Sequence, residues 1–211
     1  LKISAEAQIA LYQEIAVVLR RQTSWLARRA KAGQSVQALI DRYRPVADAL
    51  QTELDTLLDA DALNLIAASR QLQALVAQRS QRATSTVITP HPAEAARLLG
   101  ISAVDVQNDR LRASRELATR LNCVAVVKGA GTVVDDGQTT TINTTGNPLL
   151  ATSGTGDVLA GVIGALLAQG YPAADAARMG VAFHGAAADA LATRGIRRAV
   201  AGDVIAELAA L

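Results

Sequence analysis

Glycine is distributed very unevenly along this chain of 211 residues. Thirteen of the 15 glycines lie between Gly129 and Gly202, whereas Gly33 is the only glycine among the first 99 residues. Glycine permits positive φ angles and close approach of the backbone to a ligand, so tight, ligand-holding turns are expected in the second half. The first 80 residues are instead rich in Ala, Leu, Gln, Arg and Glu, and they predict helices over 4–32 and 35–80.

After residue 84 the pattern changes to alternating strands and helices. A β-prone run stops at Pro90, and a short helix with proline in its first turn ends at Gly100. The pattern predicts strands over 84–89 and 124–127, a hairpin formed by 132–134 and 139–143, and helices over 92–99, 105–121, about 155–169 and 173–194. This alternation predicts an α/β fold with a mostly parallel central sheet flanked by helices, together with a helical N-terminal portion.

Composition narrows the class of protein. Half of the residues are hydrophobic, 19% are charged and the formal net charge is only +2, which argues against nucleic acid as a partner. Residues 1–50 hold eight Lys/Arg and four Asp/Glu; a solvated helix face is the favoured interpretation and a membrane or nucleic-acid surface the alternative. The apolar stretch 158–174 is interrupted by Gln169, Gly170 and Pro172, and no secretory signal is visible, so a soluble cytoplasmic protein is expected. Cys123 lies in an apolar run and is expected to be a buried structural thiol.

The clearest chemical feature is the sequence Ser-Gly-Thr-Gly-Asp at 153–157, directly before an apolar helix. Main-chain N–H groups at a helix N-terminus can converge on an anion, so Gly154, Thr155 and Gly156 are predicted to form an anion hole. Asp157, in the first turn, could then take a proton from a hydroxyl that attacks phosphorus. The alternative is that Asp157 only stabilises the helix start and that the glycines serve packing.

Two further segments follow predicted strands. In Lys128-Gly129-Ala130-Gly131-Thr132 a lysine and two glycines stand where ligands bind in open α/β sheets, although such a lysine can equally be a plain solvated residue. His91 is held between two prolines; the alternative for it is a surface position or a structural hydrogen bond. His184, on an Ala-rich helix, fits a structural role better, and the two histidines alone do not make a metal site.

Taken together, these segments resemble those of the ADP- or ATP-dependent NAD(P)HX dehydratases, in both order and spacing. The likeness covers 84–211 and rests on 89–94 (TPHPAE), 128–132 (KGAGT), 143–148 (NTTGNP), 154–161 (GTGDVLAG), 180–185 (GVAFHG) and 201–203 (AGD). The segment 59–65 (DADALNL) resembles a further family element, which in the family follows a strand.

The resemblance implies a ribokinase-like fold and a nucleotide-repair lyase that phosphorylates the hydrated nicotinamide ring of NAD(P)HX and then loses phosphate. It implies ADP or ATP as co-substrate with Mg²⁺, and a homo-oligomer without nucleic-acid or membrane partners. Asp157 would be the base and contact the substrate, and His91 would lie along the substrate. Glu94 and Asn147 would be helpers by position. The nucleotide would be bound by Lys128, Gly129, Ala130, Gly131, Thr132 and Gly156.

The first part of the chain departs from the family pattern. It lacks the glycine-rich strand–loop–helix and the glycine-rich loop expected before Asp59, and no epimerase domain is visible. The sequence is therefore divided into a divergent helical segment, 1–58, and a catalytic region, 59–211. Two other hypotheses stay open: a small-molecule kinase of the same fold, such as a hydroxyethylthiazole kinase, and a nucleotide-binding remnant without turnover.

Overall fold

The computed structural model describes residues 55–82 and 84–211, so the helix predicted over 4–32 lies outside the described residues. The strands are β1 (Thr56–Leu58), β2 (Thr86–Ile88), β3 (Val124–Val127), β4 (Val133–Asp135) and β5 (Thr140–Ile142). The α-helices are α3 (Asp61–Ala68), α4 (Arg70–Gln78), α5 (Pro92–Leu99), α6 (Ala103–Asn108), α7 (Arg110–Leu121), α8 (Thr155–Ala168), α9 (Ala173–Thr193) and α10 (Ala201–Leu208). Two short 3-10 helices, η1 (Arg79–Arg82) and η2 (Pro148–Leu150), complete the described elements.

The strands form one mixed sheet in the order β1-β2-β3-β4-β5. β1, β2 and β3 are parallel, β4 is antiparallel to β3, and β5 is antiparallel to β4. Four of the five strands, all except β4, therefore run in one direction, which confirms the predicted sheet and the predicted hairpin. The hairpin turns at Gly137, whose φ of 86° suits glycine.

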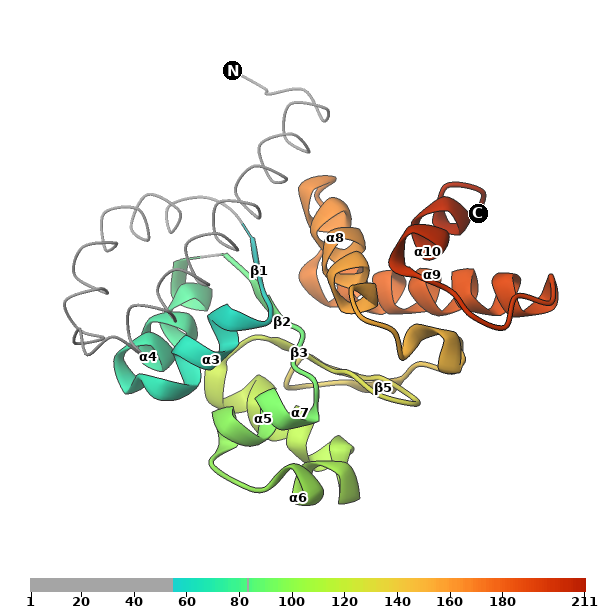
Figure 1. Ribbon diagram of the computed structural model, residues 1–211. Helices are drawn as coiled ribbons and strands as arrows, with labels where there is room; N and C mark the ends of the chain where they lie inside the picture. The colour runs from blue at the N-terminus through green and yellow to red at the C-terminus, as the bar shows by residue number, and fades with distance from the viewer. Residues whose placement is uncertain (1–54, 83) are drawn as a thin grey trace, which may run out of the picture.

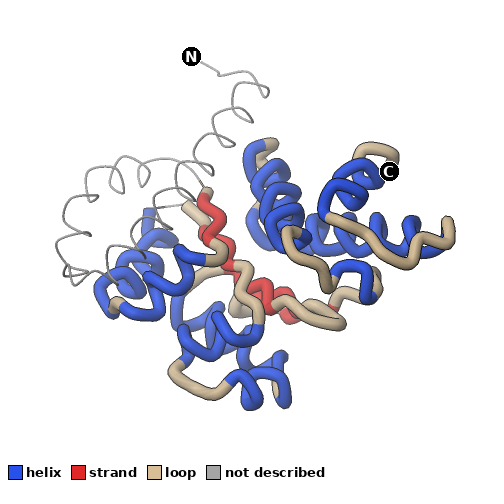
Figure 2. The backbone as a smooth tube through the Cα atoms, in the orientation of Figure 1, coloured by secondary structure: helices blue, strands red, loops and turns tan. Residues whose placement is uncertain are grey.

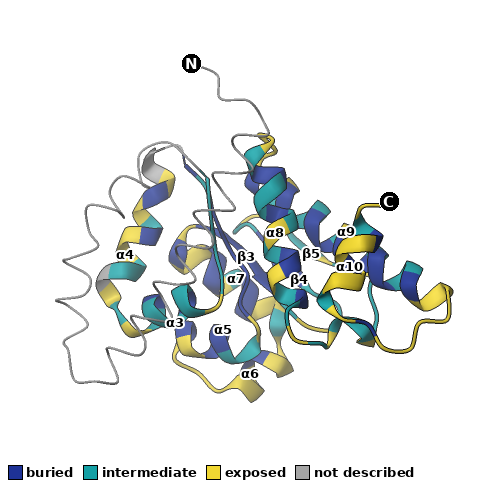
Figure 3. Ribbon diagram, turned by 45° about the horizontal axis from the view of Figure 1, so that its top comes forward, coloured by how far each residue is buried: buried dark blue, intermediate teal, exposed yellow. Residues whose placement is uncertain are grey.

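Helices cover both faces of the sheet. Figure 1 shows α3, α4, α5 and α7 on one side of the strands and α8, α9 and α10 on the other, and Figure 2 shows the strands running between them. Side chains alternate along the strands. Ile88, Ala125 and Val127 pack with the first set of helices, whereas Val87, Val124, Val126 and Val134 pack with α8 and α9. Figure 3 shows the buried strands at the centre of this three-layer arrangement.

Most predicted elements after residue 84 are confirmed with slightly different bounds, but one helix predicted before that residue and two details after it differ. The helix predicted over 35–80 lies outside the described residues up to 54. It is wrong at 56–58, because this segment pairs in parallel with β2 at the edge of the described sheet, and the remainder is two helices, α3 and α4, separated at Ser69. Leucine favours helices in isolation, and tertiary pairing overrides that preference. The helix predicted over 105–121 is two helices, because Asp109 leaves helical geometry and caps α7 by accepting from the Arg112 amide. The helix α10 was not predicted.

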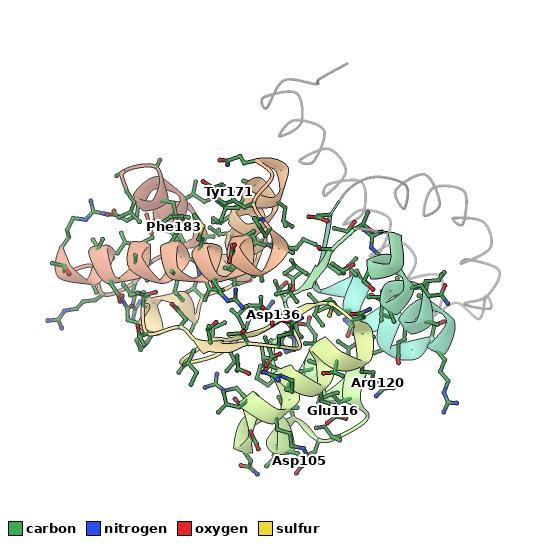
Figure 4. The ribbon with its side chains drawn as sticks, turned by 180° about the vertical axis from the view of Figure 1, so that it is seen from behind. Asp105, Glu116, Arg120, Asp136, Tyr171 and Phe183 are labelled. Carbon is green, nitrogen blue, oxygen red and sulfur yellow. The ribbon has the colours of Figure 1, made fainter. Side chains whose placement is uncertain are left out.

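The described part of the chain also bears on two predictions from composition. Cys123 is buried, and burial raises the pKa of its thiol to about 12, as expected of a structural cysteine. No helix among residues 55–82 and 84–211 combines the length and apolarity needed to cross a bilayer. An ion pair between Arg178 of α9 and Asp136, at 2.5 Å, joins the hairpin turn to the helical layer. Figure 4 labels Asp136 in this turn.

The helices α8 and α9 are in close contact at Gly180. A Cβ atom there would lie 2.5 Å from Cγ1 of the fully buried Ile163. We expect Gly180→Ala to lower the free energy of unfolding by about 1–2 kcal/mol, because overpacking exceeds the gain in helix propensity. Gly164→Ala is the matched control: a Cβ there meets nothing within 4 Å, so the substitution should stabilise by up to about 1 kcal/mol. Urea unfolding measures both, and equal effects would contradict the packing argument.

Candidate functional site

The carboxyl ends of the parallel strands meet at one edge of the sheet. The segment after β2 is joined to both neighbours: the Thr89 amide donates to the Leu58 carbonyl at 3.2 Å, and the Lys128 amide donates to the Pro90 carbonyl at 2.9 Å. Asp59, His91 and Lys128 each follow a strand that ends here. This is the edge where open α/β sheets bind ligands.

Lys128 brings three separate segments together at this edge. Its Nζ atom lies 2.9 Å from Oδ1 of Asp59, and the two side chains are 21% and 13% exposed. A Cβ atom built on Gly156 would lie 3.5 Å from the same Nζ atom. The ammonium group therefore lies between the end of β1 and the start of α8. A plain solvated lysine, the alternative from the sequence, does not fit this position.

The N-terminus of α8 lies next to this ammonium group. Gly154 occupies the N-cap position with a φ of 89°, and it has no side chain to accept from the amides of the first turn. Amides in a first turn have no partner within the helix, and they attract anions. Asp157 is exposed in the same turn. Lys128 and the glycine-capped turn thus form a place suited to a polyphosphate.

Thr155 and His184 join this turn to neighbouring parts of the structure. The buried Thr155 hydroxyl is 2.6 Å from the Leu150 carbonyl and 2.8 Å from the Thr152 carbonyl, and the Thr155 amide donates to Thr152. His184 of α9 is buried and contacts the main chain of Thr155. The structural role expected for His184 therefore fits its place, and the geometry favours Gly156 over Thr155 as a donor to an anion.

The burial of His184 has a consequence for stability. Desolvation lowers the pKa of its imidazole below the ordinary value of 6.5, although the contact with Thr155 opposes the shift. Below about pH 6.5 the unfolded chain therefore binds a proton that the folded protein does not, and the free energy of unfolding falls as the pH is lowered.

We expect His184→Gln to remove the contribution of His184 to the pH dependence of the free energy of unfolding. The check is the difference in urea midpoint between about pH 7.5 and about pH 5.5, which should shrink in the variant. His91→Gln serves as the control, since it leaves His184 in place. An unchanged pH difference in His184→Gln would contradict the assignment.

In the loop after β3, two glycines adopt conformations that favour glycine, and the binding of nucleotide there stays a prediction. Gly129 and Gly131 have φ angles of 153° and 64°, and the Thr132 hydroxyl donates to the Gly129 carbonyl at 3.0 Å. Gly129 and Ala130 are exposed. The guanidinium group of Arg110 stabilises the loop by donating to the Ala130 carbonyl.

His91 caps α5. Its Nδ1 atom accepts from the amides of Ala93 and Glu94 at 3.1 and 3.4 Å, which leaves the ring proton on Nε2, 3.3 Å from Oε1 of Glu94. The buried Glu94 accepts in turn from the His91 amide at 2.9 Å. The structural alternative thus accounts for both residues, and the substrate contact of His91 stays a prediction. Because His91 satisfies the start of α5, the anion-binding potential lies at α8.

Sequence reasoning did not identify Asp59, Arg110 or Asp189 as parts of the site. Asp59 pairs with Lys128, which lies 69 positions further along the chain. Arg110 donates to the Ala130 carbonyl, 20 positions away. Asp189 of α9 accepts from Gly146 and Asn147. Arg110 and Asp189 are single charged residues within helices, with no local pattern to mark them, whereas Asp59 opens the segment 59–65, whose resemblance to a family element assigned no role to this residue. Two hollows of about 400 and 290 Å³ lie elsewhere, along α7 and at the amino ends of β2 and β3, so shape alone does not locate the site.

The sheet, its two helical layers and its ligand edge define a ribokinase-like α/β protein, and similarity to solved structures of that fold confirms the expected class. Over residues 32–209 the chain matches the family model described as NAD(P)H-hydrate dehydratase. Since this match spans well over half of the chain, the chain belongs to the NAD(P)H-hydrate dehydratase family. The family match begins within the segment 1–58.

Three individual proteins illustrate the likeness. The chain is 47% identical over 151 residues to the bifunctional NAD(P)H-hydrate repair enzyme Nnr of Vibrio cholerae, covering 71% of this chain and 28% of that protein. It is 44% identical over 141 residues to the ADP-dependent (S)-NAD(P)H-hydrate dehydratase of Neisseria meningitidis, covering 66% and 46%. The chain thus spans less than half the length of both curated relatives. A crystal structure of the Bacillus subtilis ADP/ATP-dependent dehydratase, co-crystallised with ATP and Mg²⁺, is 30% identical with a TM-score of 0.66, covering 78% of this chain and 56% of that one.

Proposed function

We propose that this chain carries the phosphoryl-transfer site of an ADP- or ATP-dependent (S)-NAD(P)H-hydrate dehydratase, a lyase of nicotinamide-nucleotide repair. The observation that carries the proposal is the meeting of Lys128, Asp59 and Gly156 at the glycine-capped start of α8. The family membership and the names of the relatives supply the substrate: hydrated NADH or NADPH, with an adenine nucleotide as phosphate donor.

The chemistry follows from the positions of the charges. The Lys128 ammonium and the amides of the α8 turn hold the terminal phosphoryl group, and loop 128–132 holds the rest of the nucleotide. Asp157 takes the proton from the ring hydroxyl, whose oxygen bonds to phosphorus while the nucleotide leaves. The carbon–oxygen bond then breaks, phosphate departs with the bonding electrons, and loss of a proton from the adjacent carbon restores the double bond of NADH or NADPH.

Mg²⁺ fits this site as a companion of the nucleotide. Among the described residues, no three His, Cys, Asp or Glu side chains are grouped to hold a metal ion by themselves. Mg²⁺ is commonly held by phosphate oxygens together with one or two carboxylates and water. Asp59, beside Lys128, would supply such a carboxylate. When bound, the ion would offset phosphate charge, and Lys128 would share that task.

The test is incubation of the full chain with hydrated NADH and either ADP or ATP, followed through NADH absorbance. Recovery of NADH that depends on the nucleotide supports the proposal. Nucleotide binding without recovery favours the remnant hypothesis, and phosphorylation of an unrelated alcohol favours the small-molecule kinase. The boundary at residue 59, the homo-oligomer and the cytoplasmic location belong to this proposal as predictions.

A further inference from the structure

The helix α9 carries no residue assigned to the chemistry, yet it holds the segment between β5 and α8. The two carboxylate oxygens of Asp189 accept from the Gly146 amide at 2.8 Å and from Nδ2 of Asn147 at 2.9 Å. Oδ1 of Asn147 accepts from the Leu149 amide at 3.0 Å and caps η2. Asp189 thus fixes the backbone and a capping side chain at once.

Further contacts bring the loop 143–147 directly onto α9. The Thr145 hydroxyl is 3.1 Å from the Ala182 carbonyl, and Nδ2 of Asn143 donates to the Val181 carbonyl at 3.5 Å. A Cβ atom on Gly185 would lie 2.1 Å from Oγ1 of Thr145, so only glycine leaves room for the loop. Asp189 therefore acts on a loop that is already in contact with the helix.

This loop connects the two parts of the proposed nucleotide site. At one end the Asn143 amide donates to the Thr132 carbonyl at 2.8 Å, in the loop after β3. At the other end η2 leads to the α8 turn, where the Thr155 hydroxyl lies 2.6 Å from the Leu150 carbonyl. A shift of 143–147 would reach both the nucleotide loop and the anion-holding turn.

From these contacts we infer that Asp189 is a positioning residue for the nucleotide site. Both of its oxygens are occupied by N–H donors, and a carboxylate would repel phosphate, so Asp189 acts through the loop. It keeps loop 128–132 and the start of α8 at the separation that a bound adenine nucleotide requires. The inference rests on the proposed function only in taking that nucleotide as the ligand.

Asp189→Asn is the test, because asparagine keeps the size but replaces one acceptor oxygen by a donor. We expect faster amide hydrogen exchange at both 129–132 and 154–158 in the ligand-free protein. We also expect calorimetry to show ADP binding weakened by about tenfold, as losing one hydrogen bond to a charged acceptor allows. Asp175→Asn on the same helix is the control, since this carboxylate is exposed and pairs with Arg178 of its own helix; both measurements should stay at wild-type values.

A second variant separates positioning from general stability. In Asn147→Asp/Asp189→Asn the donor and acceptor of the side-chain pair are exchanged, while the oxygen facing the Gly146 amide is retained, so exchange rates and ADP affinity should recover to within about threefold of wild type. Unchanged exchange at both loops in Asp189→Asn, or wild-type ADP affinity in that variant, would overturn the inference. If the wild-type chain bound no ADP, the proposed function would fail, and the hydrogen exchange would still decide the role of Asp189.

Discussion

Asp157→Asn is expected to abolish turnover while leaving nucleotide binding nearly unchanged. Asparagine has the shape of aspartate but cannot take the proton of the attacking hydroxyl, so the rate of NADH recovery should fall by at least about 100-fold. The amides of the α8 turn stay in place, and loss of a negative charge beside a polyphosphate cannot weaken its binding. The rate is measured under single-turnover conditions, and the dissociation constant for ADP by calorimetry.

Asp175→Asn is the matched control, because Asp175 is an exposed carboxylate in the first turn of the neighbouring helix α9. Its rate should equal that of the wild type. A near-normal rate in Asp157→Asn would leave Asp157 as a residue that only stabilises the helix start, the alternative already open from the sequence.

Lys128→Met is expected to weaken nucleotide binding by about 100-fold, the upper range for one charge-assisted contact, and to reduce the rate as well. The substitution removes the ammonium group beside Gly156 and leaves the half-buried Asp59 carboxylate unpaired next to the phosphates. Binding is measured by calorimetry at two salt concentrations, and the salt dependence should also decrease.

The repulsion from Asp59 can be tested separately. In Asp59→Asn/Lys128→Met the uncompensated carboxylate is absent, so in Mg²⁺-free buffer the affinity for ADP should be higher than in Lys128→Met alone. Arg112→Met, on the exposed side of α7, controls for loss of a cation and should bind ADP normally. Normal ADP affinity in Lys128→Met would remove Lys128 from the site.

Local signals explain which parts of the fold could be predicted. The strand β3, the hairpin and the helices α8 and α9 are bounded by Gly and Pro or consist of β-branched residues, so their own sequence defines them. β1 could not be predicted from its own residues, since Thr56–Leu58 lies among helix-forming residues and becomes a strand through pairing with β2; only the resemblance of 59–65 to a family element that follows a strand pointed to it. The break at Asp109 depends on a cap that polar residues offer in many places where no helix begins.

The features of the candidate site also fall into those that could be predicted from the sequence and those that could not. The glycine-capped start of α8 and the loop 128–132 could be recognised from sequence, because backbone conformation there requires glycine and the adjacent apolar runs define a helix and a strand. The resemblance placed Lys128 and Gly156 at one nucleotide site, but the pairing of Lys128 with Asp59 was not predictable, since it joins the end of β3 to the end of β1. For His91 the sequence left open a structural hydrogen bond, and the folded structure showed which one, the cap of α5; its contact with the substrate stays a prediction.

The sequence by itself determined the turns, the apolar faces and the order of elements from residue 84 onward, because these depend on interactions between residues close together in the chain. Only the tertiary structure decided that β1 joins the sheet, that Lys128 bridges β1 and α8, and that Asp189 supports the loop between β5 and α8. Such contacts depend on the packing of distant elements, which leaves no periodic or spacing pattern in a single sequence.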